Sequence, residues 1–233
     1  MPTIQSKAPA SKKIIFVVAC LFALAFFSAH EFLLNFYPET LAQRNVIKFF
    51  ISVIPLLLSF FAWRANKSAL SLFITLGLLL CCVGDVVINI SLLISIALYL
   101  VGHSLFIKGF FCCKKPRAFQ FVLWGGMFLS ICVWLLFFAG ISTTQKIEGL
   151  VYSAFMCAMV AFSFCGPALV CAGGIVFGLS DVLLMLNIVL DTEKGLPHII
   201  ALGVYYVGVF LMAAHVFLVE RPSTAKNDSA SID

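Results

Sequence analysis

The sequence predicts an all-α membrane protein with eight transmembrane helices joined by short loops. The 233 residues are 63% hydrophobic and only 11% charged, whereas soluble domains are roughly 45–50% apolar. The mean hydropathy is +1.12, and the chain divides into apolar runs that are long enough to cross a bilayer. This composition excludes a soluble globular domain, and we expect an integral multi-pass protein of the bacterial cytoplasmic membrane.

Eight apolar runs follow one another between polar or turn-forming residues. Residues 1–13 form a polar tail before them and residues 220–233 another after them, so the transmembrane domain is expected over residues 14–219. A cleaved signal peptide is an alternative for the first run, which is longer than a typical signal-peptide core. The expected spans are residues 14–36, 46–63, 69–88, 92–111, 118–141, 147–164, 168–190 and 199–219.

The distribution of Lys and Arg predicts that both termini are cytoplasmic. An even number of spans places both ends of the chain on one side, and Lys and Arg concentrate in cytoplasmic loops. Of the 15 Lys and Arg, all but Arg44, Lys48, Lys146 and Lys194 fall on the side of the termini. The net charge of +5 therefore reflects topology, and we expect no nucleic-acid partner.

Two aspartates within apolar runs are the strongest functional signal. Asp85 follows Gly84 near the end of the third run, and Asp181 follows Ser180 in the seventh. A carboxylate at the centre of a bilayer costs at least ~2.5 kcal/mol, so such a residue is a functional candidate. Other embedded polar residues are expected at similar depth, which predicts one cavity open to the non-cytoplasmic side. They are Glu31, Lys48, His103, Glu148, Tyr152, Tyr205 and Tyr206.

Short matches between the two halves of the chain suggest a parallel repeat of four helices. Gly84-Asp85 in the third run corresponds to Ser180-Asp181 in the seventh. Likewise, Tyr99-x-x-Gly102 in the fourth corresponds to Tyr205-x-x-Gly208 in the eighth. Such a repeat would relate the halves by an axis along the membrane normal and bring the two aspartates face to face.

Each embedded polar residue also has a purely structural interpretation. The aspartates could pair with Lys48 or His103 to hold helices together, or Lys48 could extend its ammonium to the interface. Tyr205 and Tyr206 could be interfacial anchors. Three further ionisable residues are expected at the interface, namely Glu31, Glu148 and His198.

The cysteines and histidines do not indicate a metal site. The nine cysteines lie in or next to apolar runs, where we interpret them as small packing residues and free thiols. No group of His, Cys and carboxylate residues has the spacing of metal ligands on one helix. We expect neither a metal nor another cofactor.

The order of these motifs resembles the YhhN family, which includes the animal lysoplasmalogenases. The resemblance extends from about Lys48 to Ala214, with one departure at Phe49, where a proline is expected after the lysine. It rests on Lys48 in a short second run, Gly84-Asp85, Gly102-His103, Tyr152, residues 174–187 with Phe177 and Ser180-Asp181, and the Tyr205-Tyr206 run.

The resemblance implies hydrolysis of the vinyl-ether bond of a lysoplasmalogen, giving a fatty aldehyde and glycerophosphoethanolamine or glycerophosphocholine. An enol ether is cleaved by protonation of its β-carbon, and water then attacks the resulting oxocarbenium ion. The reaction needs one neutral carboxylic acid and one carboxylate, a division that desolvation and a like-charged neighbour can produce within a pair. We expect Asp181 to be the acid and Asp85 to position the nucleophile, with the reverse assignment open.

The remaining candidates are expected to bind the lysophospholipid or lysoplasmalogen substrate within the membrane lipid. Lys48 would meet the phosphate. His103, Tyr152 and Tyr205 would orient the carboxyl groups or the glycerol hydroxyl. The expected substrate-binding set also includes Ser180, Asn187 and Tyr206.

Two other functions fit parts of the pattern. A small proton-coupled transporter could use a protonatable aspartate in a parallel repeat. An intramembrane aspartyl protease would need a G-x-G-D motif, which Cys82-Val83-Gly84-Asp85 and Gly178-Leu179-Ser180-Asp181 each miss by one residue. No Pro-Ala-Leu sequence follows either of them.

Overall fold

The computed structural model describes residues 9–37, 41–137, 140–190 and 195–219, and it is all-helical over these ranges. Within these ranges eight helices are long and apolar enough to span a membrane, which confirms the predicted number. They are α1 (Ala10–Phe36), α2 (Leu41–Asn66), α3 (Ala69–Val87), α4 (Leu92–Phe111), α5 (Ala118–Phe137), α6 (Thr143–Ser163), α7 (Ala168–Val189) and α8 (Leu196–Ala214), which continues as the π-helix η1 (His215–Val219).

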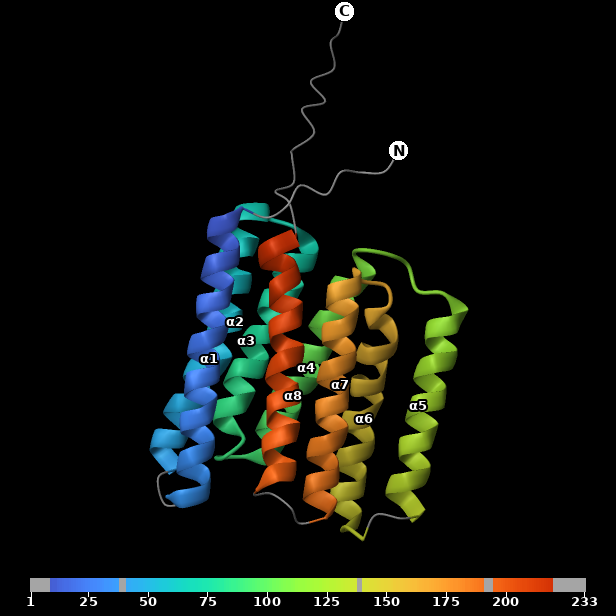
Figure 1. Ribbon diagram of the computed structural model, residues 1–233. Helices are drawn as coiled ribbons and strands as arrows, with labels where there is room; N and C mark the ends of the chain where they lie inside the picture. The colour runs from blue at the N-terminus through green and yellow to red at the C-terminus, as the bar shows by residue number, and fades with distance from the viewer. Residues whose placement is uncertain (1–8, 38–40, 138–139, 191–194, 220–233) are drawn as a thin grey trace, which may run out of the picture.

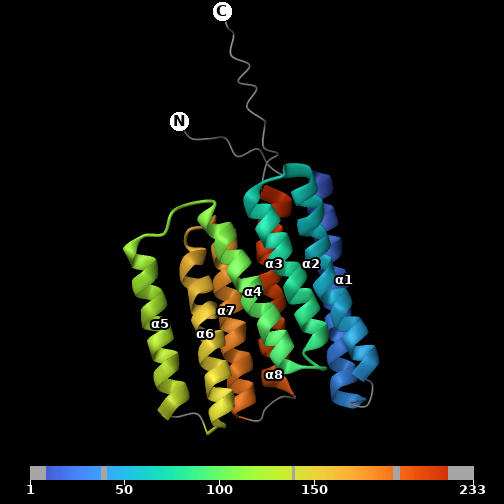
Figure 2. The ribbon, with the colours of Figure 1, turned by 180° about the vertical axis from the view of Figure 1, so that it is seen from behind.

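Six of the helices close into a ring, and the other two pack outside it. In the ring α2 contacts α3, α3 contacts α4, α4 contacts α6, α6 contacts α7, α7 contacts α8, and α8 returns to α2. Figures 1 and 2 show α1 at one edge against α2 and α5 at the opposite edge against α6. The arrangement of neighbours is therefore nearly the same for α2–α4 as for α6–α8.

The beginning of α1 and the end of η1 lie at the same end of the molecule (Figure 1). The Lys12 ammonium donates a hydrogen bond of 3.1 Å to the carbonyl oxygen of Phe217. At this end the ring is filled by large side chains that are fully buried, including Phe106, Phe110, Met159 and Met212. Any open space in the ring is consequently restricted to the opposite end.

Several helices extend beyond their apolar runs. The first helix begins at Ala10 instead of residue 14, α2 covers more than the predicted 46–63, and α6 begins at Thr143 instead of residue 147. Hydropathy marks only the part of a helix that fits the hydrocarbon core, whereas backbone hydrogen bonding continues into polar flanks. At α6, Ser142 and Gln145 form a capping box that fixes this early start. The fifth helix ends at Phe137, before the predicted residue 141.

Two pairs of helices cross at glycines, and α7 and α8 approach each other more closely than α3 and α4 do. A Cβ on Gly102 of α4 would lie 3.4 Å from the carbonyl oxygen of Gly77 in α3, and a Cβ on Gly208 of α8 would lie 3.0 Å from that of Gly173 in α7. Small residues permit such close crossings of membrane helices. Gly77 lies eight residues before Asp85, and Gly173 lies eight residues before Asp181. The α3–α4 and α7–α8 pairs thus hold their aspartates at corresponding positions relative to the crossing.

Candidate functional site

A cavity of about 220 Å³ lies within the ring at the end away from the first residues of α1. Both aspartates line it, as the sequence predicted from their depth. Much of the wall is aliphatic, with Ile88, Leu92, Leu184 and Ile188 among the residues. The polar residues of the wall are Lys48, Asp85, Ser95, Tyr99, Gln145, Glu148, Tyr152, Asp181, His198 and Tyr205.

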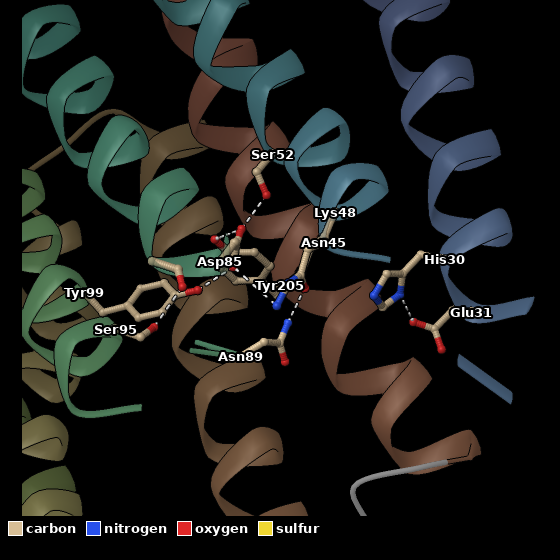
Figure 3. Close-up of polar contacts among 11 residues, drawn as sticks. His30, Glu31, Asn45, Lys48, Ser52, Asp85, Asn89, Ser95, Tyr99 and Tyr205 are labelled. Carbon is tan, nitrogen blue, oxygen red and sulfur yellow. Dashed lines mark hydrogen bonds and ion pairs between the residues drawn. The ribbon is translucent and has the colours of Figure 1, made fainter. Parts of the chain in front are cut away.

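Asp85 is surrounded by donors although it lies in an apolar span. The Ser52 hydroxyl donates to Oδ2, the Tyr99 hydroxyl donates to Oδ1, and the Tyr205 hydroxyl donates to Oδ2 at 3.1 Å. The ammonium of Lys48 lies 3.9 Å from Oδ1. These side chains come from α2, α3, α4 and α8, and Figure 3 shows them converging on Asp85. Hydroxyl donors and a nearby cation together compensate the burial of a charged carboxylate, whose side chain is 1% exposed.

The Gly84-Asp85 sequence has a direct structural role in this arrangement. The ring of Tyr99 lies over Gly84, where a Cβ would be 3.2 Å from the tyrosine Cε2. The tight connection between α3 and α4 is held by the Ser95 hydroxyl, which donates 2.9 Å to the Gly84 carbonyl oxygen. The glycine therefore lets the phenol of Tyr99 reach the carboxylate of the next residue.

Asp181 has quite different surroundings. Its Oδ2 lies 3.6 Å from Nε2 of His103, beyond a normal hydrogen bond. The Tyr152 phenol also lies close to this carboxyl group. Within the described ranges, neither Oδ2 of Asp181 nor either ring nitrogen of His103 has a hydrogen-bond partner. Buried polar atoms normally have one, so Oδ2 of Asp181 has unused hydrogen-bonding capacity on the side of the residue that faces His103.

Four residues expected to bind substrate do not line the cavity. His103 lies one turn beyond Tyr99, where its ring packs against Tyr152 and Phe177 with centroids 5.5 and 5.3 Å away. Ser180 turns away from the cavity and donates 2.6 Å to the carbonyl oxygen of Phe177.

Tyr206 and Asn187 are the other two expected residues that do not line the cavity. The ring of Tyr206 faces Phe27 of α1, because consecutive residues of a helix point about 100° apart. Asn187 is buried in α7 but is not among the residues of the cavity wall. Only Lys48, Tyr152 and Tyr205 of the expected substrate-binding set line the wall beside the two aspartates.

The burial of several of these residues argues against their purely structural interpretations. Tyr205 and Tyr206 are 3% and 6% exposed, so they are not interfacial anchors. Lys48 is buried beside Asp85 and does not extend to the interface. Glu31 is likewise buried, and its Oε1 lies 3.0 Å from Nδ1 of His30. Figure 3 draws these two side chains beside each other. Two contacts expected from the structural interpretation are present. Lys48 lies beside Asp85, and His103 lies beside Asp181.

Sequence reasoning missed several residues of the site. Ser52 was detectable, because it lies four residues after Lys48 and so on the same helical face. Tyr99 belonged to the Tyr-x-x-Gly match between the halves, but its bond to Asp85 was not anticipated. Glu148 and His198, expected at the interface, line the cavity instead.

In the part of the chain that the structure describes, no three His, Cys, Asp or Glu side chains are grouped so as to hold a metal ion. The groups available for chemistry in the cavity are thus carboxyl, phenol, hydroxyl, amide, imidazole and ammonium groups. They can transfer protons, orient water and bind charged or polar groups.

Comparison with protein-family models gives a match to the YhhN family over residues 43–216. This range contains both aspartates and all the polar residues of the cavity wall. Comparisons with curated proteins and with solved structures returned no match.

Proposed function

The chain belongs to the YhhN family, and from this premise we propose that it is an intramembrane hydrolase that cleaves the vinyl-ether bond of lysoplasmalogens. One observation carries the proposal: two carboxyl groups from helices remote in sequence line the same cavity in unlike surroundings. Asp85 is held by three hydroxyl donors beside an ammonium, whereas Asp181 retains an oxygen without a partner among the described residues. Acid-catalysed hydrolysis of an enol ether needs a proton donor to carbon and benefits from a base that orients the attacking water, and two carboxyl groups can divide these roles.

In the proposed reaction Asp181 is the general acid and Asp85 is the carboxylate. Asp181 transfers its proton to the β-carbon of the vinyl ether and generates an oxocarbenium ion. Water oriented by Asp85 attacks the carbon bonded to the ether oxygen and gives a proton to that carboxylate. The hemiacetal then collapses to the aldehyde and the free glycerol hydroxyl, and a proton passes from Asp85 back to Asp181. Glycosidases manage a related oxocarbenium ion with two carboxyl groups.

The remaining wall residues suit a lysolipid. The aliphatic side chains would lie along the hydrocarbon chain, and Lys48 would attract the phosphate. We further infer that both termini are cytoplasmic, with residues 1–13 and 220–233 as tails, because Lys and Arg concentrate on that side. The cavity would then open towards the non-cytoplasmic leaflet, and the membrane would be the bacterial cytoplasmic membrane.

The direct test is turnover by the purified protein in detergent. We expect it to release fatty aldehyde from 1-alkenyl-glycerophosphoethanolamine or 1-alkenyl-glycerophosphocholine. The matched 1-alkyl ethers should give no aldehyde, because they lack the double bond that is protonated. A transporter would show no turnover in detergent and would act only across a sealed membrane. Absence of aldehyde from folded protein with both substrates would refute the proposed hydrolase.

Two adjacent tyrosines provide a sharper test of the Asp85 environment. Tyr205→Phe should lower kcat about tenfold, because it removes a hydrogen bond to the carboxylate that positions water. Tyr206→Phe is the matched control, since the Tyr206 ring packs against Phe27 of α1 and Tyr206 does not line the cavity, and its kcat should stay within about twofold. Both are measured as aldehyde release per folded molecule. Equal losses in the two variants would contradict the assigned role of Tyr205.

A further inference from the structure

The two halves of the ring contribute corresponding pairs of residues to the cavity. On α2, Lys48 and Ser52 lie four residues apart, and Ser52 bonds to Asp85 on the following helix. On α6, Glu148 and Tyr152 also lie four residues apart, and Tyr152 lies close to Asp181 on the following helix. A spacing of four places both members of each pair on one face of their helix. Lys48 and Glu148 therefore occupy corresponding positions in the two halves.

The charges at these corresponding positions are opposite. Lys48 and Glu148 both line the cavity, with Lys48 buried and Glu148 half-buried. The Lys48 ammonium is 3.9 Å from Asp85, too far for a hydrogen bond. Among the residues that the structure describes it makes no other polar contact, so its N–H donors are available to a ligand. No hydrogen bond or ion pair of Glu148 is found among the residues described. The same cavity thus offers a cationic and an anionic side chain, each able to accept a charged partner.

We propose that Glu148 binds the ammonium group of a zwitterionic lysophospholipid headgroup whose phosphate is bound by Lys48. The inference deepens the proposed function, on which it rests for the identity of the substrate as a lysolipid. Phosphoethanolamine and phosphocholine carry one negative and one positive group separated by two carbons, which a cation and an anion on opposite sides of one cavity can bind together. A headgroup with phosphate alone leaves Glu148 without a partner and places two negative groups in the same space.

The test compares three 1-alkenyl lysolipids, with phosphoethanolamine, phosphocholine or phosphate alone as headgroup. Glu148→Gln should raise KM about tenfold for the two zwitterionic lipids, because it removes a charge-assisted contact. The KM for the phosphate-only lipid should be unchanged or lower, and kcat should stay within about threefold for all three. Glu148→Lys should reverse the preference and favour the phosphate-only lipid.

Lys146→Gln is the matched control. It also removes one charge from α6, but the Lys146 ammonium donates to the carbonyl oxygen of Leu136 and does not line the cavity. Its KM values should equal those of the unmodified protein. Equal KM changes for all three lipids in Glu148→Gln would overturn the ammonium site. A collapse of kcat at constant KM would also overturn it, by making Glu148 a proton-transfer group.

A binding measurement tests the headgroup site independently of whether the protein is a hydrolase. The non-hydrolysable 1-alkyl-glycerophosphocholine should raise the melting temperature of the unmodified protein more than that of Glu148→Gln, whereas 1-alkyl-glycerophosphate should not distinguish them. If this difference is observed but no alkenyl lipid is hydrolysed, the headgroup site stands and the hydrolase fails. If alkenyl lipids are hydrolysed without any dependence on Glu148, the hydrolase stands and the headgroup site fails.

Discussion

Asp181→Asn and Asp85→Asn should each lower kcat for aldehyde release by about 10³-fold or more, because general acid and base groups contribute roughly 10²–10⁴-fold each. An amide cannot donate a proton to carbon in place of Asp181, and it cannot accept the proton of the attacking water in place of Asp85. The two losses should not add fully in the double variant, because the acid and the carboxylate serve one reaction coordinate.

The measurement must separate lost chemistry from lost folding, because both aspartates also contact other helices. Kinetics should be reported per folded molecule, with melting temperature and monodispersity in detergent as checks. Ser180→Ala is the matched control beside Asp181, since its hydroxyl bonds only to the carbonyl oxygen of Phe177 in the described structure and its kcat should stay within about twofold. If the aspartates only held helices together, the folded fraction would fall while activity per folded molecule persisted.

The fold was largely predictable because the bilayer imposes a simple rule on the sequence. A span must be about 20 residues of mostly apolar side chains, so the eight runs and their order could be located from hydropathy. The ends of the helices could not, because polar flanks such as residues 143–146 are helical for reasons of capping rather than hydropathy. The ring of six helices depends on which faces meet, and that information lies in glycines such as Gly173 and Gly208.

The site was predictable to the extent that each residue was costly to bury. Asp85 and Asp181 were identified from the cost of a carboxylate in the bilayer, and both line the cavity. Depth alone did not give helical phase, and for this reason Tyr206 was grouped with Tyr205 although it faces α1. Ser52 was missed because a serine in a membrane helix carries little penalty and so gives little signal, even though it bonds directly to Asp85.

A Gly208→Ala substitution should destabilise the protein strongly, whereas Gly102→Ala should not. A Cβ on Gly208 would lie 2.7 Å from the backbone nitrogen of Phe177 and 2.9 Å from its Cα. Backbone atoms cannot rotate aside, so α7 and α8 must separate, and such overpacking costs about 1–3 kcal/mol or more. The corresponding Cβ on Gly102 meets nothing closer than 3.4 Å, which is an ordinary contact. Alanine also favours a helix over glycine by roughly 1 kcal/mol.

Comparing Gly208→Ala with Gly102→Ala therefore isolates the steric cost of an added Cβ at corresponding positions of the two halves. Melting temperature in detergent should fall by many degrees for Gly208→Ala and stay the same or rise for Gly102→Ala. Tyr205 lies three residues before Gly208 on the same helix, so separating α8 from α7 should also lengthen the Tyr205 bond to Asp85 and lower kcat in the molecules that remain folded. Normal stability and activity of Gly208→Ala would mean that α7 and α8 do not cross as closely as described, and the position of Tyr205 beside Asp85 would lose its support.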